Sequence, residues 1–415
     1  MWQTIRSWLN RHPVTLLALV VLLGFLVSYQ LRQSNWKFRY LRAASQLLAG
    51  EDLYQKHLGF AYPPCRALMM VPFLAVPEGL QVSCWWAIQA IALVCVCRWS
   101  WKLAGGTDLE PVQKLTVEHG LWLAGMFTGI FYAFNSLSHQ STDIVEAFLI
   151  MAGCRAYASN RVLSAACWWG WAAAMKATPL LWCLFLLWKR CYLAAIVVLL
   201  VAVGFNLLPD LLSTSPTASS WLVGWWNSYI SQILNASYTP ADWGTFIYNN
   251  QSLAGMLHRL LDTTPLVEKL LGLLMAGALL VAAGLAMERT VPEKHKLPVV
   301  AMEFSMVLLL MLLFSPMSGK SHFVVLLLPG MVVARQAWWS GSYLLGSILL
   351  GANILGMLAL NWWDKPFSVA AMYASVITMK TLLLYLACLI SRFRVMEASQ
   401  PCWQERSAPS LSYQT

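Results

Sequence analysis

Acidic and basic side chains in this sequence concentrate in short polar segments that separate long apolar runs. The acidic residues of interest are Glu51, Asp52, Asp143, Glu146, Asp210, Asp242, Asp262 and Asp364. The cations that accompany them are Arg39, Arg42, Lys56, Arg66, Lys176, Arg259 and Lys320. A carboxylate beside cations suits group transfer from a phosphate-activated donor, because the carboxylate accepts the proton of the attacking hydroxyl and the cations stabilise the departing phosphate. Any single one of these charges could equally be a solvated loop residue.

Six short patterns bring polar groups together along the chain. They are 50–54 (Gly-Glu-Asp-Leu-Tyr), 62–64 (Tyr-Pro-Pro), 135–143 with its Gln140, 176–179 (Lys-Ala-Thr-Pro), 249–252 (Asn-Asn-Gln-Ser) and 315–322, which ends at His322. Structural roles compete with chemical ones, since Asp52 can cap a turn, Lys176 can mark a helix end and His322 can bond a neighbouring helix. The pattern 250–252 also matches a glycosylation acceptor, although a structural polar turn explains it as well.

The elements that must position these groups are apolar helices. Of the 415 residues, 59% are hydrophobic and 11% are charged, and the mean hydropathy is +0.60. Soluble domains carry about 25% charged residues, and the surface of a soluble protein could not hold so much apolar area. The 22 Trp residues agree, because Trp collects where hydrocarbon meets lipid headgroups. We therefore expect an all-α, polytopic membrane protein.

Two other classes of protein are disfavoured by the same composition. The formal charge of +10 comes from cations scattered singly or in small groups, as topology signals are, and not from a nucleic-acid-binding patch. The ten cysteines lie mostly inside apolar runs without the paired spacing of zinc ligands, and the carboxylates show no spacing that fixes a cation. We expect no metal and no other cofactor.

Apolar runs that approach the roughly 20 residues of a membrane span predict about 12 transmembrane helices. The runs are 13–29, 81–101, 118–134, 143–159, 162–176, 178–190, 192–208, 267–287, 298–316, 322–335, 338–360 and 368–391. The first run is not followed by a small-residue cleavage pattern, so we expect it to remain as a helix. Runs 162–176 and 178–190 are short, and they are either two tilted helices broken near Pro179 or one re-entrant element.

The positive-inside rule orients these spans. With the N-terminus inside, the cytoplasmic segments hold more than half of the 28 Lys and Arg residues. Both termini are then cytoplasmic, and all six polar patterns fall on the opposite face. We expect one transmembrane domain over 1–395, with outer loops 30–77 and 209–266 and short interfacial helices, and a disordered cytoplasmic tail over 396–415. We expect the Trp-rich loop 209–266 to be an interfacial amphipathic segment, an aromatic surface for a sugar or lipid chain, or both, since the two roles are compatible.

The order of the polar patterns resembles glycosyltransferase family 87. The residues that carry the resemblance are Ala43, Ala44, Gly50, Asp52, Tyr54, Tyr62, Pro63, Pro64, Gln140, Lys176, Pro179, Asn250, Gln251, Ser252, Ser315, Pro316 and His322. The resemblance extends over about residues 10–390. It implies a GT-C-like membrane fold, a lipid-linked sugar donor, an outward-facing site and inversion at the anomeric carbon.

The resemblance also bears on the catalytic base. The family's base is an acid early in the first outer loop, and Trp36 occupies about that place here. Asp52 matches the second acid of the same loop and is the first candidate for a substitute base. Asp143 lies near the Asn position of the family's polar turn and is the alternative. His322 matches a position near the donor phosphate, where it could be an acid, a base or a phosphate partner.

The resulting prediction is a membrane glycosyltransferase that moves a hexose, with mannose preferred, from a polyprenyl-phosphate donor to a lipid or glycan acceptor. The reaction would take place on the extracytoplasmic face of a bacterial cytoplasmic membrane. The predicted site residues are Asp52, Asp143 and His322 for catalysis, Lys176, Arg42 and Lys320 for the donor phosphate, and Tyr62, Gln140, Asn250 and Gln251 for substrate. The alternatives are a catalytically silent relative that binds lipid-linked sugar, and a lipid or solute transporter. Transport is disfavoured because helix centres nearly lack charges, apart from Lys380.

Overall fold

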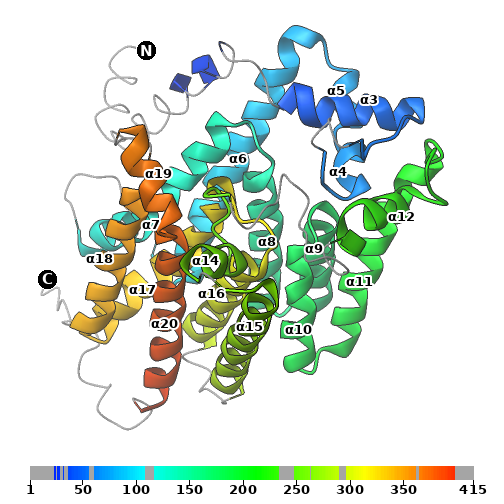
Figure 1. The fold of residues 1–415 in the computed structure, drawn as a ribbon. Coiled ribbons are helices and arrows are strands. Elements are labelled where there is room, and N and C mark those ends of the chain that lie inside the picture. The colour runs from blue at the N-terminus through cyan, green and yellow to red at the C-terminus, as the bar shows by residue number, and fades with distance from the viewer. Residues whose placement is uncertain are drawn as a thin grey trace, which may run out of the picture.

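The computed structural model describes residues 23–24, 26–28, 31, 36–55, 60–107, 116–232, 247–261, 263–288, 296–360 and 364–397. Every regular element within these ranges is a helix, as Figure 1 shows, so the all-α prediction is confirmed. Most of the predicted first span 13–29, the stretch 233–246 of the second outer loop and the predicted tail from 398 onward lie outside the described residues.

Six helices in the described ranges are long and apolar enough to cross a membrane, and the protein is a multi-pass membrane protein. They are Glu78–Leu103, Tyr192–Leu211, Leu266–Met287, Leu297–Phe314, Lys320–Trp339 and Val376–Arg394. Shorter apolar helices occupy Pro64–Leu74, Val162–Met175, Thr178–Trp188 and Tyr343–Leu358. The predicted count of about 12 spans is not confirmed, because several of the predicted spans form helices well short of roughly 20 residues.

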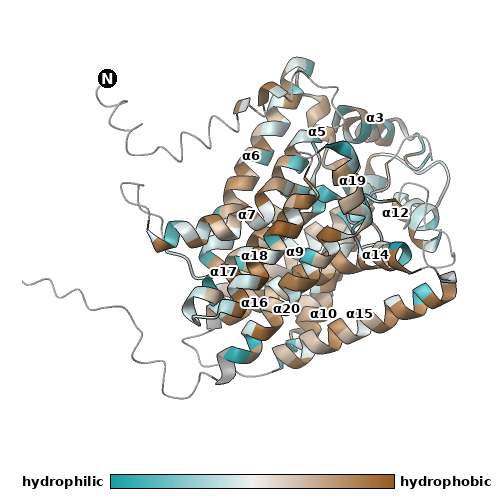
Figure 2. Ribbon diagram, turned by 60° about the vertical axis from the view of Figure 1, so that its left-hand side comes forward, coloured by the Kyte–Doolittle hydropathy of each residue, from teal (hydrophilic) through white to brown (hydrophobic). Residues whose placement is uncertain are grey.

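The apolar helices, both long and short, pack into one bundle. Their bounds are α6 (Glu78–Leu103), α7 (Val117–Ser138), α8 (Asp143–Ala158), α9 (Val162–Met175), α10 (Leu181–Trp188), α11 (Tyr192–Leu207), α15 (Pro265–Met287), α16 (Lys296–Phe314), α17 (Leu327–Trp339), α18 (Tyr343–Leu358) and α20 (Val376–Glu397). In the spans that contain α16 and α17, 78% of the residues in an 18-residue apolar window are buried, whereas 22% are buried in the span of α15. Figure 2 shows α15 on the outside of the bundle with mostly hydrophobic residues, and several of its Leu and Val side chains are exposed, as expected for a helix in contact with lipid.

Close packing of helices depends on small residues at one interface. Helix α9 packs between α8 and α11, and α17 packs along α7. Gly125 and Gly129 of α7 face α17, where a side-chain carbon on Gly129 would lie 2.7 Å from the backbone nitrogen of Leu327. The spacing of these two glycines is the one that lets membrane helices approach closely.

Short helices gather at one end of the bundle, and all but the last of them belong to the predicted outer loops 30–77 and 209–266. They are η1 (Lys37–Leu41), α3 (Arg42–Ala49), α4 (Pro64–Leu68), α5 (Val71–Leu74), α12 (Trp221–Trp225), η5 (Trp226–Ile230), α14 (Leu253–Leu260) and α19 (Lys365–Tyr373). Figure 1 shows α3, α4, α5 and α12 together at the upper right of the molecule. Helix α3 ends at Gly50, whose φ of 69° is left-handed, a conformation that glycine commonly adopts at the end of a helix.

The helices are divided at two places, near Pro179 and within the predicted run 368–391. Residues 162–176 and 178–190 form α9 and α10 on either side of the 3-10 turn η3 (Thr178–Leu180), which contains Pro179. The predicted run 368–391 is not one helix, because Ser375 adopts a φ of 60° and separates α19 from α20. A residue with positive φ cannot continue a right-handed helix.

Candidate active site

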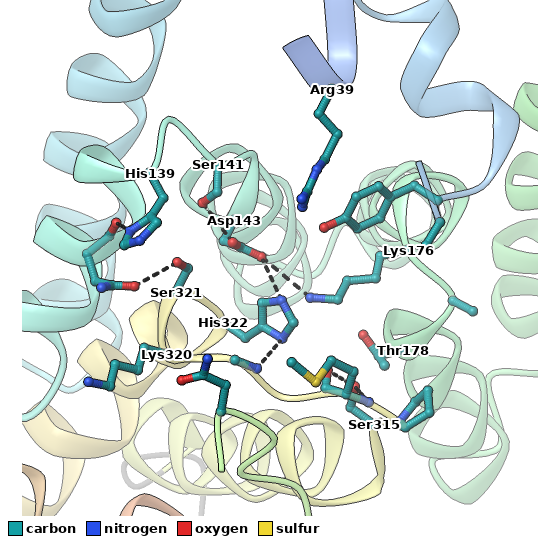
Figure 3. Close-up of a pocket in the computed structure, with 18 of the residues that line it drawn as sticks. Arg39, His139, Ser141, Asp143, Lys176, Thr178, Ser315, Lys320, Ser321 and His322 are labelled. Carbon is teal, nitrogen blue, oxygen red and sulfur yellow. Dashed lines mark hydrogen bonds and ion pairs between the residues drawn. The ribbon is translucent and has the colours of Figure 1, made fainter. Parts of the chain in front are cut away.

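A cavity of about 810 Å³ opens among the short helices (Figure 3). Its walls come from η1, segment 61–63, the turn between α7 and α8, the corner 176–178, residues 248–249, the loop 315–322 and α19, with Trp225 and Ile230 beside them. Five of the six polar patterns of the sequence therefore contribute to one cavity, and the pattern 50–54 does not. The fold has brought together segments that are far apart in the chain.

Asp143 is the centre of the polar contacts in this cavity. It is the first residue of α8 and follows a turn in which Gln140 has a φ of 54°. The Ser141 hydroxyl donates to Asp143 Oδ2 at 2.8 Å. The other oxygen, Oδ1, lies 3.5 Å from Lys176 Nζ and 3.6 Å from His322 Nε2, as the dashed lines of Figure 3 show. One carboxylate is therefore anchored by a hydroxyl and faces two basic groups.

Lys176 reaches this carboxylate because α9 ends there. Its backbone is extended, with φ −161° and ψ 131°, and Pro179 follows in η3. The Nζ atom also lies 3.7 Å from Oε2 of Glu146, which follows Asp143 by one turn of α8. The ammonium group thus lies between two carboxylates.

The orientation of His322 is fixed by the backbone of its own loop. His322 belongs to η8 (Lys320–Leu326), and the N–H of Gly319 donates to its Nδ1 atom at 3.2 Å. Since Nδ1 accepts this hydrogen bond, the proton of the neutral imidazole resides on Nε2, the nitrogen that faces Asp143.

A buried arginine lies between the Glu146 carboxylate and the Tyr62 ring. Arg66, which is 1% exposed, lies with Nη2 3.4 Å from Glu146 Oε2, and its guanidinium is 3.7 Å from the centroid of the Tyr62 ring. The hydroxyl of Tyr40 donates to that of Tyr62 at 3.3 Å, and both rings line the cavity. Burial raises the pKa of Tyr40 well above its ordinary value, so the phenol stays neutral.

Five of the ten predicted site residues line the cavity, namely Asp143, His322, Lys176, Lys320 and Tyr62. The Lys320 ammonium donates to the carbonyl oxygen of Ala359 at 2.6 Å. Figure 3 shows Lys320 apart from the group formed by Asp143, Lys176 and His322. Arg39, which the prediction did not include, reaches into the cavity from η1 above Asp143.

Asp52 and Arg42 are not among the cavity-lining residues. Asp52 Oδ1 accepts a hydrogen bond from the backbone N–H of Tyr54 at 2.9 Å, which is the turn-capping role that competed with catalysis in the sequence. The Arg42 guanidinium lies 5.8 Å from the centroid of the Phe38 ring on the exposed side of its helix.

Asn250 and Gln251 are fully buried and tie loops together beside the cavity. Asn250 Nδ2 donates to the carbonyl of Pro316 at 2.9 Å, and its Oδ1 accepts from the N–H of Ser318 at 3.2 Å. Gln251 Nε2 donates to the carbonyl of Met372 at 2.8 Å. These two amides therefore hold the loop 315–319 and the corner after α19 in place.

Trp36, at the place of the family's usual acid, is a core residue. It is 0% exposed and stacks on Trp85 with a centroid distance of 5.4 Å and an interplanar angle of 11°. The backbone N–H of Trp36 donates to Oε1 of Gln140 at 3.5 Å, and Trp85 Nε1 donates to the backbone carbonyl of Gln140 at 3.3 Å. Gln140 thus connects this aromatic core to the turn that precedes Asp143.

The described residues include no group of three or more His, Cys, Asp or Glu side chains that could hold a metal ion. The basic groups on the cavity wall, by contrast, are numerous: Arg39, Lys176, Lys320 and Lys365. Such a wall suits an anionic ligand.

The structure thus has an all-helical, multi-pass membrane fold with a cavity at one end in which a carboxylate faces several cations, an arrangement suited to an integral-membrane enzyme. The sequence model of glycosyltransferase family 87 matches residues 60–316, more than half of the chain, and the protein belongs to this family. No curated protein matches the sequence significantly. The protein is therefore a membrane glycosyltransferase that acts on a sugar donor and an acceptor, and the predicted family and enzyme class are confirmed.

Proposed function

We propose that the enzyme transfers a hexose, mannose by preference, from a polyprenyl-phosphate donor to a hydroxyl of a lipid or glycan acceptor. The observation that carries this proposal is the position of Asp143, which faces the cavity together with Lys176 and His322. A base and adjacent cations are the groups that attack by a hydroxyl on a glycosyl phosphate requires.

In this reaction Asp143 accepts the proton of the acceptor hydroxyl as the oxygen attacks the anomeric carbon. The bond between that carbon and the phosphate oxygen breaks, and the electron pair leaves with the polyprenyl phosphate. Lys176 stabilises the developing phosphate charge, and Arg39 and Lys320 extend the cationic wall. The Nε2–H group of His322 faces Asp143 and orients its carboxylate. We assign the base to Asp143 in preference to Asp52, because Asp52 caps a turn outside the cavity.

A lipid-linked donor fits the mixed character of the cavity. Beside the cations, its wall contains the apolar side chains of Trp225, Ile230, Val369 and Met372. Trp225 and Ile230 belong to α12 and η5, the short helices that follow α11. A ligand with a phosphate head and an isoprenoid chain would use both kinds of surface.

The charge distribution supports an extracytoplasmic site and cytoplasmic termini. Asp143 begins α8 at the cavity, and Arg155 lies 12 residues further on, about 18 Å along the helix axis. Lys189 directly follows α10, and Arg335 lies in the second half of α17. The 3-10 helices η3 and η8 join α10 and α17 to the cavity-lining segments 176–178 and 320–322. The positive-inside rule assigns the ends with these cations to the cytoplasm of a bacterial cell, and the cavity to the other face of its cytoplasmic membrane.

The donor class is tested with membranes from cells that express the full chain. Radiolabelled polyprenyl-phosphate-mannose and nucleotide-activated mannose are supplied separately, and label in acceptor products is measured against membranes lacking the protein. We expect transfer from the polyprenyl donor alone. Transfer from the nucleotide donor after polyprenyl-phosphate-mannose synthesis has been blocked would contradict the proposal.

A further inference from the structure

Glu146 is a second buried carboxylate at the edge of the site. It follows Asp143 by three residues on α8, so the two side chains occupy one face of the helix. Glu146 is 5% exposed and does not line the main cavity. It borders a side pocket of about 20 Å³ that also contacts Asp143, Lys176 and His322. Glu146 is therefore a neighbour of the polar groups of the site but is not part of the main cavity wall.

One oxygen of Glu146 faces two cations from two different elements. Its Oε2 atom lies 3.7 Å from Lys176 Nζ, at the corner after α9, and 3.4 Å from Arg66 Nη2, on α4. Glu146 and Asp143 thus form a cluster with Lys176 and Arg66 that contains two carboxylates and two cations, all mostly buried. Removal of one carboxylate would leave a buried positive charge in excess, which is costly in a medium of low dielectric.

The same contacts divide Lys176 between two partners. Asp143 Oδ1 and Glu146 Oε2 lie at nearly equal distances from its ammonium, 3.5 Å and 3.7 Å. If Glu146 lost its charge, Coulomb attraction would favour Asp143 as the sole partner of Lys176. The base would then be masked by the cation that should face the donor phosphate.

We propose that Glu146 is a positioning residue for sugar transfer, which holds Lys176 between Asp143 and itself and, through Arg66, holds Tyr62 on the cavity wall. The Tyr62 ring stacks on the Arg66 guanidinium and so depends on where that group is placed. This inference rests on the proposed function, since it assigns Glu146 a part in the same reaction without contact to the reacting atoms.

The first test needs no substrate. The purified full-length protein is acetylated with N-hydroxysuccinimidyl acetate, and the rate at each lysine is followed by mass spectrometry in wild type, E146Q, D143N and E303Q. Loss of a neighbouring negative charge raises the fraction of free amine, so we expect the rate at Lys176 to rise about threefold or more in both E146Q and D143N. If only D143N raises the rate, Glu146 does not hold Lys176 and the inference is wrong.

Glu303 provides the matched control. It is also a buried carboxylate, 2% exposed, and its Oε1 lies 2.8 Å from Lys189 Nζ and 3.5 Å from Arg392 Nη2. It belongs to α16, 12 residues before the cavity-lining Ser315, about 18 Å along the helix axis. We expect E303Q to raise the acetylation rate at Lys189 and to leave Lys176 unchanged.

The second test is steady-state transfer from radiolabelled polyprenyl-phosphate-mannose. We expect E146Q to lower kcat about 10- to 100-fold and to raise the KM for the donor, since misplaced groups lose rate on this scale. E146D should recover part of kcat, and E303Q should match wild type once the folded fraction is normalised. A purely structural role would instead lower the unfolding temperature of E146Q at unchanged kcat and KM. If wild type transfers no sugar from this donor, the proposed donor is wrong, whereas the acetylation rates still decide the role of Glu146.

Discussion

The Nε2 atom of His322 lies 3.6 Å from Oδ1 of Asp143, and the N–H of Gly319 fixes the other ring nitrogen. The loop before α17 thereby presents an oriented imidazole to the first residue of α8. In the proposed reaction the single N–H of the neutral imidazole, on Nε2, points to the Asp143 carboxylate and orients it as the base.

His322 should therefore be essential for turnover but not for folding. We expect H322A to lower kcat for mannose transfer by about 100-fold or more, the scale of a lost acid–base partner. H322Q should lose less, because the glutamine amide can still donate a hydrogen bond. Both rates are measured in detergent with the unfolding temperature as a control. An H322A enzyme with wild-type kcat would exclude the role.

Trp36 should not tolerate the acid that is usual at its place in the family. We expect W36D to destabilise the protein by about 3–5 kcal/mol, because it removes a buried aromatic ring from the stack with Trp85 and buries a carboxylate. W36F should cost less. Thermal unfolding of the purified variants measures the difference. A stable W36D enzyme with raised activity would place the base at position 36 and not at Asp143.

Asn250 should act through stability and not through chemistry. Its amide makes hydrogen bonds to the backbone of Pro316 and Ser318 in a fully buried setting. We expect N250A to lower the free energy of unfolding by about 1–3 kcal/mol, because buried backbone groups lose their partner. The neighbouring variant N249A is the control and should unfold near wild type. If N250A abolished transfer at unchanged stability, Asn250 would instead contact substrate.

Gly129 should be intolerant of even one methyl group. A side-chain carbon there would lie 2.7 Å from the nitrogen of Leu327, so G129A should destabilise the protein by about 1–3 kcal/mol. Gly120 lies on the same helix with no atom within 4 Å of the added carbon, and G120A should be neutral or slightly stabilising. Equal unfolding temperatures for the two variants would contradict the close approach of α7 and α17.

Much of this architecture is predictable from the sequence because lipid imposes strong patterns. Apolar composition predicts the all-α membrane class, and the order of short polar patterns predicts which segments meet at the site. The number of spans is harder to predict, because helices such as α9 and α10 are shorter than roughly 20 residues and are separated by the turn that contains Pro179. Hydropathy alone also gives no sign of a residue with positive φ, such as Ser375, which divides the predicted span 368–391.

The roles of single polar residues are harder to predict. Asp52 and Asp143 look alike in sequence, since each is an acid in a polar turn before an apolar run. Only tertiary packing directs Asp143 into the cavity and turns Asp52 back onto the amide of Tyr54. The one available signal for Glu146 is its position one helical turn after Asp143, and its shared cation, Lys176, comes from a different helix end.

The central claim is that Asp143, and not Asp52, is the base. It is tested most directly by mannose transfer from polyprenyl-phosphate-mannose in membranes that contain equal amounts of folded wild type, D143N and D52N. We predict that D143N loses at least about 100-fold in rate, whereas D52N stays within a few-fold of wild type. Retention of transfer by D143N together with its loss in D52N would contradict this account.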